Sequence, residues 1–148
     1  MPAGAEVIAL PRTKATVTLG ADWKPVVAPA LVAAYRTDSG LVLAVTRAQV
    51  PNPDAWRAKT REVYADEIER GVTARIKGYK RLARVLADRQ GVPALDLEAR
   101  RADGATIVLR VLLFRTYALT VAIEVPRKAD LAAAREITRS FGLPAPAP

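Results

Sequence analysis

Two long apolar segments, separated by only two residues, most strongly limit what this chain can fold into. Residues 106–114 and 117–125 are apolar at almost every position, and only Arg115 and Thr116 lie between them. Strands with apolar side chains on both faces are typical of the centre of a sheet that is covered on both sides. A two-residue connection favours antiparallel pairing. We expect a central β-hairpin with Leu112, Phe114, Tyr117, Leu119 and Val121 on one face, and Val111, Leu113, Ala118, Thr120 and Ala122 on the other.

Shorter strands are predicted around this hairpin. Apolar or alternating segments predict strands over residues 6–10, 14–19, 31–36, 41–47, 79–86 and 94–101. Turn-forming residues predict hairpin loops at 37–40 and 102–104, and a further turn at 91–93.

Two helices are also predicted. Asn52 and Pro53 suit a helix start, and Gly71 a helix end, with residues 72–77 fitting either more helix or a strand. Six residues of the first helix follow one another at helical spacing, and the apolar ones among them are expected to be buried. They are Trp56, Thr60, Val63, Tyr64, Glu67 and Ile68. Trp56 fits a core position better than a base-stacking platform. The second helix is expected to begin at Asp130 or just before it and to end at Gly142. One side of it is formed by Leu131, Ala134, Ile137 and Phe141.

The order of these elements predicts a single α+β domain over residues 1–143. In this fold an antiparallel sheet of about six strands packs with a long central helix and a C-terminal helix. Hydrophobic residues make up 51% of the 148 residues, which is enough for a substantial core. The Pro- and Ala-rich residues 144–148 are expected to form a flexible tail.

The amino-acid composition argues against an enzyme. The chain has no histidine and no cysteine, so it lacks the usual proton shuttle, the thiolate nucleophile and the nitrogen and sulfur metal ligands. Neither serine has an activating partner in the sequence, and no glycine-rich phosphate loop is present. Asp96 and Glu98 share one face of a predicted strand, where a catalytic carboxylate pair is less favoured than ion pairing with Arg100. We expect no catalytic residue, cofactor or metal site.

Two charges inside the apolar strands need partners. Arg110 and Glu124 either lie near solvent at strand ends or pair with one another. A buried charge without a partner would cost several kcal/mol.

Most of the net charge of +8 comes from one basic segment. Residues 69–89 contain seven basic and two acidic side chains. A polyanion or partner site is predicted there, at Arg75, Lys77, Lys80, Arg81 and Arg84. A solvated surface is the simpler interpretation. In a strand, Lys80 and Arg84 would share a face and Arg81 would lie opposite, which would split the patch. In a loop or helix the bases could converge, with Tyr79 available for stacking on a base.

The N-terminal residues bear on localisation. They contain no basic start and no long apolar stretch of a signal peptide, which predicts a cytoplasmic protein for the sequence as it stands. If a signal was removed, an envelope or secreted location fits equally. No membrane span is predicted, because charged residues interrupt the most apolar stretch, 107–125.

The chain resembles the PsbP/Mog-like group of α-β-α sandwiches over nearly its whole length. The resemblance rests on the order of several motifs. They are Ala21-Asp22-Trp23, Ala44-Val45-Thr46-Arg47, a long helix, Gly91 to Leu97, Tyr117 to Val121, and a closing helix with Ile137-Thr138-Arg139-Ser140-Phe141. The group includes a photosystem subunit, a Ran-binding protein, envelope lipoproteins and type VI secretion effector chaperones.

The resemblance implies a non-catalytic protein-binding or adaptor module, and it does not select a partner. Two alternatives stay open. One is polyanion binding, to nucleic acid or acidic lipid, through the basic segment. The other is a chaperone of type VI secretion effectors.

Overall fold

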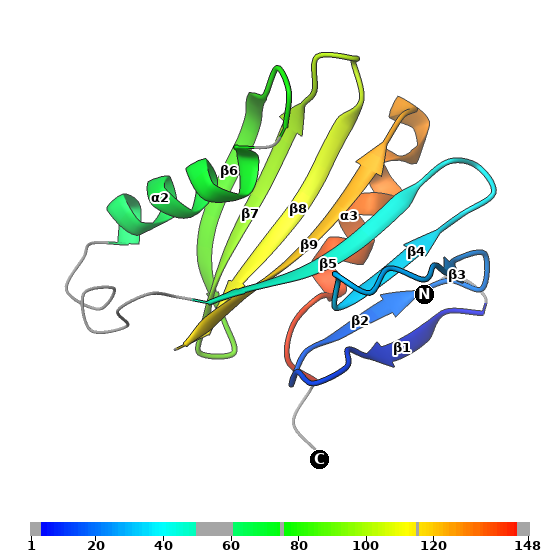
Figure 1. The fold of residues 1–148 in the computed structure, drawn as a ribbon, viewed down its shortest axis with the longest axis horizontal. Coiled ribbons are helices and arrows are strands. Elements are labelled where there is room, and N and C mark those ends of the chain that lie inside the picture. Colours follow the sequence, from blue (N-terminus) through cyan, green and yellow to red (C-terminus); the bar gives the residue numbers. More distant parts are fainter. Residues whose placement is uncertain (1–3, 50–60, 75, 115, 145–148) are drawn as a thin grey trace.

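Seven antiparallel strands form the main sheet in the computed structural model (Figure 1). The structure describes residues 4–49, 61–74, 76–114 and 116–144. The sheet strands are β3 (Lys24–Pro25), β4 (Ala33–Arg36), β5 (Val42–Gln49), β6 (Lys80–Arg89), β7 (Val92–Arg100), β8 (Thr106–Leu113) and β9 (Tyr117–Val125), in the order β3-β4-β5-β9-β8-β7-β6. The expected α+β class is confirmed, with slightly more strands than predicted.

The other elements are a second, two-stranded sheet and the helices. Strands β1 (Glu6–Ala9) and β2 (Thr16–Leu19) pair with one another. The helices are α2 (Arg61–Thr73), a short 3-10 turn η1 (Lys128–Asp130) and α3 (Leu131–Ser140). Within the described ranges, no helix has the length and apolar character needed to cross a bilayer.

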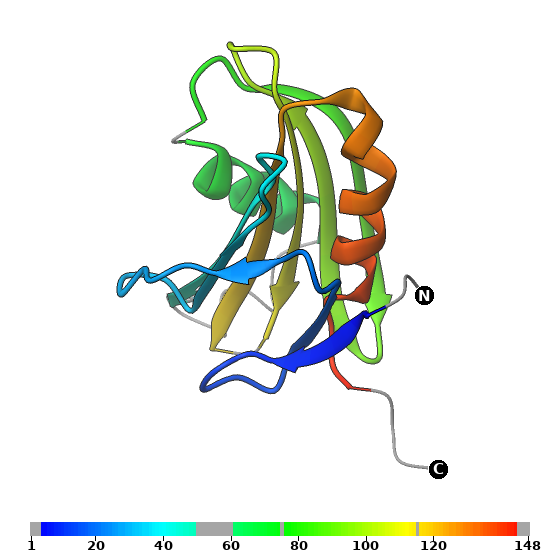
Figure 2. The ribbon, with the colours of Figure 1, turned by 90° about the vertical axis from the view of Figure 1, so that its right-hand side faces the viewer.

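The central hairpin forms as predicted. Leu112 pairs with Leu119, and the Phe114 N–H donates to the Tyr117 carbonyl at 2.9 Å. The two faces of this hairpin belong to two separate apolar cores. Figure 2 shows why both faces are covered, since α2 and α3 lie on opposite sides of the sheet.

The α3 side of the sheet is closed by the β1–β2 sheet. Ala134 and Ile137 of α3, and Phe141 directly after the helix, are buried as predicted, and Leu131 is partly buried. Beyond the last turn of α3, Gly142 forms two backbone hydrogen bonds with Thr16 of β2, of 2.8 and 3.1 Å. These bonds attach the end of α3 to β2, whose inward side chains complete the same core.

The α2 side differs from the prediction. The helix runs through Gly71 to Thr73, so Gly71 does not end it. Ala65 is buried in the core on this side, with the partly buried Ile68, which was predicted, and Val72 packed beside it. Val63 of the predicted stripe is 47% exposed, whereas Glu69 is buried. This rotation of the helix lets Glu69 point toward β6, where it meets arginines. The predicted helix start at Asn52, and Trp56 with Thr60, lie outside the described residues.

Three smaller differences concern strands and turns. β3 was not predicted. Strand β6 continues to Arg89, and the turn after it is formed by Gln90 and Gly91, both at positive φ, so Val92 and Pro93 already belong to β7. The predicted domain end at residue 143 and the tail at 144–148 stay predictions, because residues 145–148 lie outside the described part.

Candidate functional site

A pocket of about 330 Å³ opens beside α3, and we call it the α3 pocket. Its apolar wall is formed by Trp23, Leu41 and Ile137, all buried members of the core. Its polar lining comprises three carboxylates, of Asp22, Asp130 and Glu136, and three hydroxyls, of Thr18, Ser39 and Ser140. A pocket of this size suits one side chain or a small ligand fragment.

Hydrogen bonds hold the walls of the α3 pocket in place. Thr37 fixes the β4–β5 loop, because its side-chain oxygen accepts from the Leu41 N–H at 3.1 Å and pairs with the Ser39 hydroxyl at 2.8 Å. Ser140 of α3 accepts from the Thr18 N–H at 2.9 Å. The turn before β3 is closed by a hydrogen bond from the Trp23 N–H to the Gly20 carbonyl. A site with walls tied in this way loses little conformational entropy when a ligand binds.

The charge of the α3 pocket is opposite to that of the protein. Asp130 pairs with Arg127 at 3.3 Å. No ion pair to Asp22 or Glu136 is found in the described part of the chain, and none of the described lining residues is basic. The net charge of the chain is nevertheless +8. The arrangement is suited to a cationic group on an aliphatic stem, which would contact the apolar wall and reach the carboxylates.

The carboxylates considered for catalysis line a second depression, of about 260 Å³, beside β7. Asp96 binds Arg110 through both oxygens, at 2.6 and 3.0 Å. Glu98 binds Arg135 of α3 in the same way, at 2.5 and 3.0 Å, and this contact raises the pKa of Arg135. Ion pairing is therefore what these side chains do, although the partners differ from the predicted Arg100.

The two charges inside the apolar strands have separate partners. Arg110 is only 3% exposed, and besides Asp96 it donates to the carbonyls of Arg139 and Phe141, at 3.2 and 3.1 Å. It thereby satisfies carbonyls at the C-terminal end of α3, which have no partner within the helix. Glu124 pairs with Arg101 at 2.7 Å. Of the two alternatives left open, pairing of Arg110 with Glu124 is not found, and Glu124 lies near the end of β9 with its side chain 45% exposed.

The predicted basic site is divided by an irregularity in β6. Arg81 pairs in register with Ala99, but Ala83 pairs with Glu98, so Leu82 is an extra residue in the ladder. Such a bulge shifts the alternation of side chains by one residue. Arg81 and Arg84 therefore share the α2 side of the sheet. The predicted sharing of one face by Lys80 and Arg84 is wrong for this reason.

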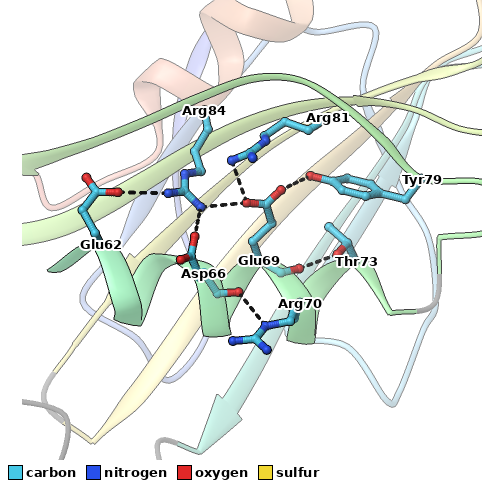
Figure 3. A network of polar contacts seen from close by, with 8 residues as sticks. All are labelled: Glu62, Asp66, Glu69, Arg70, Thr73, Tyr79, Arg81 and Arg84. Atoms are coloured by element: carbon cyan, nitrogen blue, oxygen red, sulfur yellow. Dashed lines mark hydrogen bonds and ion pairs between the residues drawn. The ribbon is translucent and has the colours of Figure 1, made fainter. Parts of the chain in front are cut away.

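Arg81 and Arg84 bind acidic residues of α2 (Figure 3). Arg84 forms ion pairs with Glu62, Asp66 and Glu69, at 3.0, 2.6 and 2.9 Å. These bonds, with Asp66 first and Glu69 second, raise the pKa of Arg84, and the bond from Arg84 lowers the pKa of Asp66. These three acids of α2 are therefore paired with a strand, β6.

Glu69 lies at the centre of this network. It is 9% exposed, accepts from Arg81 at 3.2 Å and accepts from the Tyr79 hydroxyl at 2.5 Å. Burial, and then the bond to Glu69, raise the pKa of Tyr79. A buried carboxylate is tolerated only with several partners, so the network fastens α2 to β6. Two of the five predicted site residues have this structural role.

The other three predicted site residues are placed differently. Lys77 lies in the loop before β6, Lys80 begins β6, and both are exposed. Lys80 pairs in register with Arg100, on the sheet face opposite Arg81. Arg75 lies outside the described residues. The polyanion site stays a prediction, with Lys77 and Lys80 as its exposed members.

Comparisons with known proteins address the fold. The solution structure of cyanobacterial PsbP (CyanoP) from Synechocystis sp. PCC 6803 superposes with a TM-score of 0.71, over 97% of this chain and 95% of that chain, at 14% identity. The chain has a PsbP-like fold. A protein of unknown function from Pseudomonas aeruginosa, PA94, matches with a TM-score of 0.47 and 18% identity, over 97% of this chain and 99% of that chain. No family model and no curated protein matches the sequence.

The α3 pocket was not found by sequence reasoning. Its three carboxylates come from the loop before β3, from η1 and from α3, and Asp22 is more than a hundred residues from the other two in the chain. Asp22 and Trp23 belong to a motif of the family resemblance, but the sequence did not predict a binding role for them. No spacing pattern connects them with Glu136, because the pocket exists only after α3 packs against β2.

Proposed function

We propose that this protein is a non-catalytic accessory module, and that its α3 pocket receives a basic side chain of a protein partner. The observation that carries the proposal is the combination of an apolar wall with two carboxylates, of Asp22 and Glu136, that form no ion pair within the described residues. A lysine or arginine of a partner would place its aliphatic stem against Trp23 and its charged end near Asp22 and Glu136.

Two further observations support a binding role over a catalytic one. The carboxylate pair considered for acid–base chemistry is occupied by Arg110 and Arg135. The PsbP-like fold belongs, by the resemblance described above, to a group whose members mostly bind or assist other proteins. Both observations favour an accessory module and leave the identity of the partner open.

The experiment selects peptides from a random displayed library on the immobilised protein and then measures the affinity of the enriched peptides in solution. We expect enriched peptides to contain a basic residue next to apolar residues. Asp22→Asn/Glu136→Gln should weaken their binding at least about tenfold, because two charge-assisted hydrogen bonds are lost. Peptides without a basic residue, or equal binding to the double variant, would contradict the proposal.

A matched control separates the pocket from net charge. Glu67→Gln/Asp88→Asn makes the same change in charge on α2 and β6, both exposed and outside the pocket. This control should keep full affinity for the selected peptides. A similar loss in both double variants would mean that only long-range charge is involved.

Polyanion binding through the basic segment stays a second hypothesis, supported by the exposure of Lys77 and Lys80. Its clean test is Lys77→Glu/Lys80→Glu, titrated with oligonucleotides at two salt concentrations. Arg84→Glu is unsuitable, since it would place a fourth carboxylate among Glu62, Asp66 and Glu69. The chaperone and cytoplasmic interpretations also stay predictions.

A further inference from the structure

The loop between β3 and β4 is an exposed apolar tip. We define the apolar tip as residues 26–31, which are all Val, Ala, Pro or Leu. Val27 is 93% exposed and Val26 41% exposed, and Pro29 and Ala30 are exposed as well. Single exposed apolar side chains are ordinary on protein surfaces, but a contiguous exposed set indicates a contact surface.

Some of the backbone N–H groups of the apolar tip are already hydrogen-bonded within the protein. The Val26 N–H donates to the Ala34 carbonyl at 2.9 Å, and the Leu31 N–H donates to the Ala28 carbonyl at 3.0 Å. Pro29 has no N–H to satisfy. Each internal hydrogen bond removes part of the cost of moving a polar backbone group into an apolar medium. In Figure 2 this light-blue chain projects away from the sheet, on the side opposite α3.

Basic side chains lie directly behind the apolar tip. Lys24 of β3 and Arg36 of β4 are paired in register, and both are exposed. Two exposed acidic residues, Asp22 and Asp38, border this segment, and Asp38 pairs with Lys24 at 3.2 Å. Arg36 has no carboxylate partner in the described part of the chain. An apolar tip with an unpaired cation beside it is suited to the interface of an acidic membrane.

We propose that the apolar tip inserts into the interface of an acidic lipid bilayer, with Arg36 at the level of the lipid phosphates. This surface differs from the α3 pocket, and the proposal is independent of the proposed function. Lipid is favoured over a protein groove because the tip is convex and consists of small apolar side chains. It carries none of the Trp, Tyr or Arg residues that dominate protein–protein hot spots.

The test is flotation of the full chain with vesicles, either of phosphatidylcholine alone or of equal parts phosphatidylcholine and phosphatidylglycerol. The wild type should bind the mixed vesicles, and binding should weaken as salt screens the charges. Val27→Asp should lower the partition coefficient at least about tenfold, because a charge replaces the valine side chain that would be buried in the bilayer. The side chain at this position is almost wholly in solvent, so the fold should be unchanged, which circular dichroism verifies.

The matched control is Val7→Asp on β1, where the valine is 59% exposed and lies outside the apolar tip. It should bind vesicles like the wild type, whereas Arg36→Gln should lose affinity for the mixed vesicles only. Absent binding of the wild type to the mixed vesicles would overturn the proposal, as would equal losses for Val27→Asp and Val7→Asp. If vesicle binding is absent and Val27→Asp instead abolishes self-association in solution, the tip is a protein contact.

Discussion

The buried ion pair between Arg110 and Asp96 gives the sharpest stability prediction. Arg110→Met keeps most of the apolar stem and removes every hydrogen bond of the guanidinium. The carbonyls of Arg139 and Phe141 then lose their donor, and Asp96 loses both of its bonds. Each buried carbonyl left unsatisfied costs about 1–3 kcal/mol.

The expected total is about 3–5 kcal/mol, the range found when one partner of a buried pair is removed. The lower half of that range is more reasonable here, because the Asp96 side chain is 32% exposed and water can reach it. Domains of this kind are stable by about 5–15 kcal/mol, so the variant should fold with reduced stability. The free energy of unfolding is measured by urea titration, followed by tryptophan fluorescence and circular dichroism.

A control and a mutant cycle test the reasoning. Arg101→Met removes a more exposed guanidinium from Asp103 and Glu124 and should cost at most about 1 kcal/mol. Asp96→Ala should be costly in the wild type, where it leaves Arg110 buried without its carboxylate, and nearly neutral in Arg110→Met. Additive costs, or a loss below about 1 kcal/mol for Arg110→Met, would refute the structural role of the pair.

Three further predictions concern the contact of α2 and β6 and the loops beside it. Glu69→Gln should lower the free energy of unfolding by about 1–3 kcal/mol, whereas Glu62→Gln, at a 78% exposed side chain, should change it by less than about 0.5 kcal/mol in the same urea titration. Gly78→Ala should destabilise more than Gly91→Ala: both glycines have positive φ, but a Cβ at Gly78 would lie 2.5 Å from a neighbouring side chain, and one at Gly91 meets nothing within 4 Å. Equal melting temperatures for the two glycine variants would contradict this. The pKa of Tyr79 is higher in the folded than in the unfolded state, so the contribution of the neutral Tyr79 side chain to stability is complete below about pH 10 and is lost as the pH rises above that value. Above about pH 10 the urea midpoint of the wild type should therefore fall faster with pH than that of Tyr79→Phe.

Local patterns were enough to predict much of the fold. The hairpin of β8 and β9, with its loop and both faces, follows from a period of two and a two-residue connection. The buried side of α3 follows from helical spacing. These features depend on residues close together in the chain, so local sequence patterns are enough to predict them.

Features that depend on distant pairing could not be predicted. The extra residue Leu82 appears only when β6 is aligned with β7, and it reverses which bases share a face. The acidic side chains of α2 pair with Arg84 because packing turns the helix toward β6, a rotation that helical spacing alone did not give. The α3 pocket likewise requires three separate segments to meet.

The way the arginines are used changes what the net charge of +8 implies about partners. Arg81, Arg84, Arg110 and Arg135 are bound to carboxylates within the fold, so each contributes little to an external field. The same pairs also neutralise acidic residues, whereas Asp22 and Glu136 of the α3 pocket form no ion pair within the described residues. A partner near that pocket meets a local negative charge, although the protein as a whole is basic. Local placement of charge, and not its total, therefore decides which chemistry each surface can recognise.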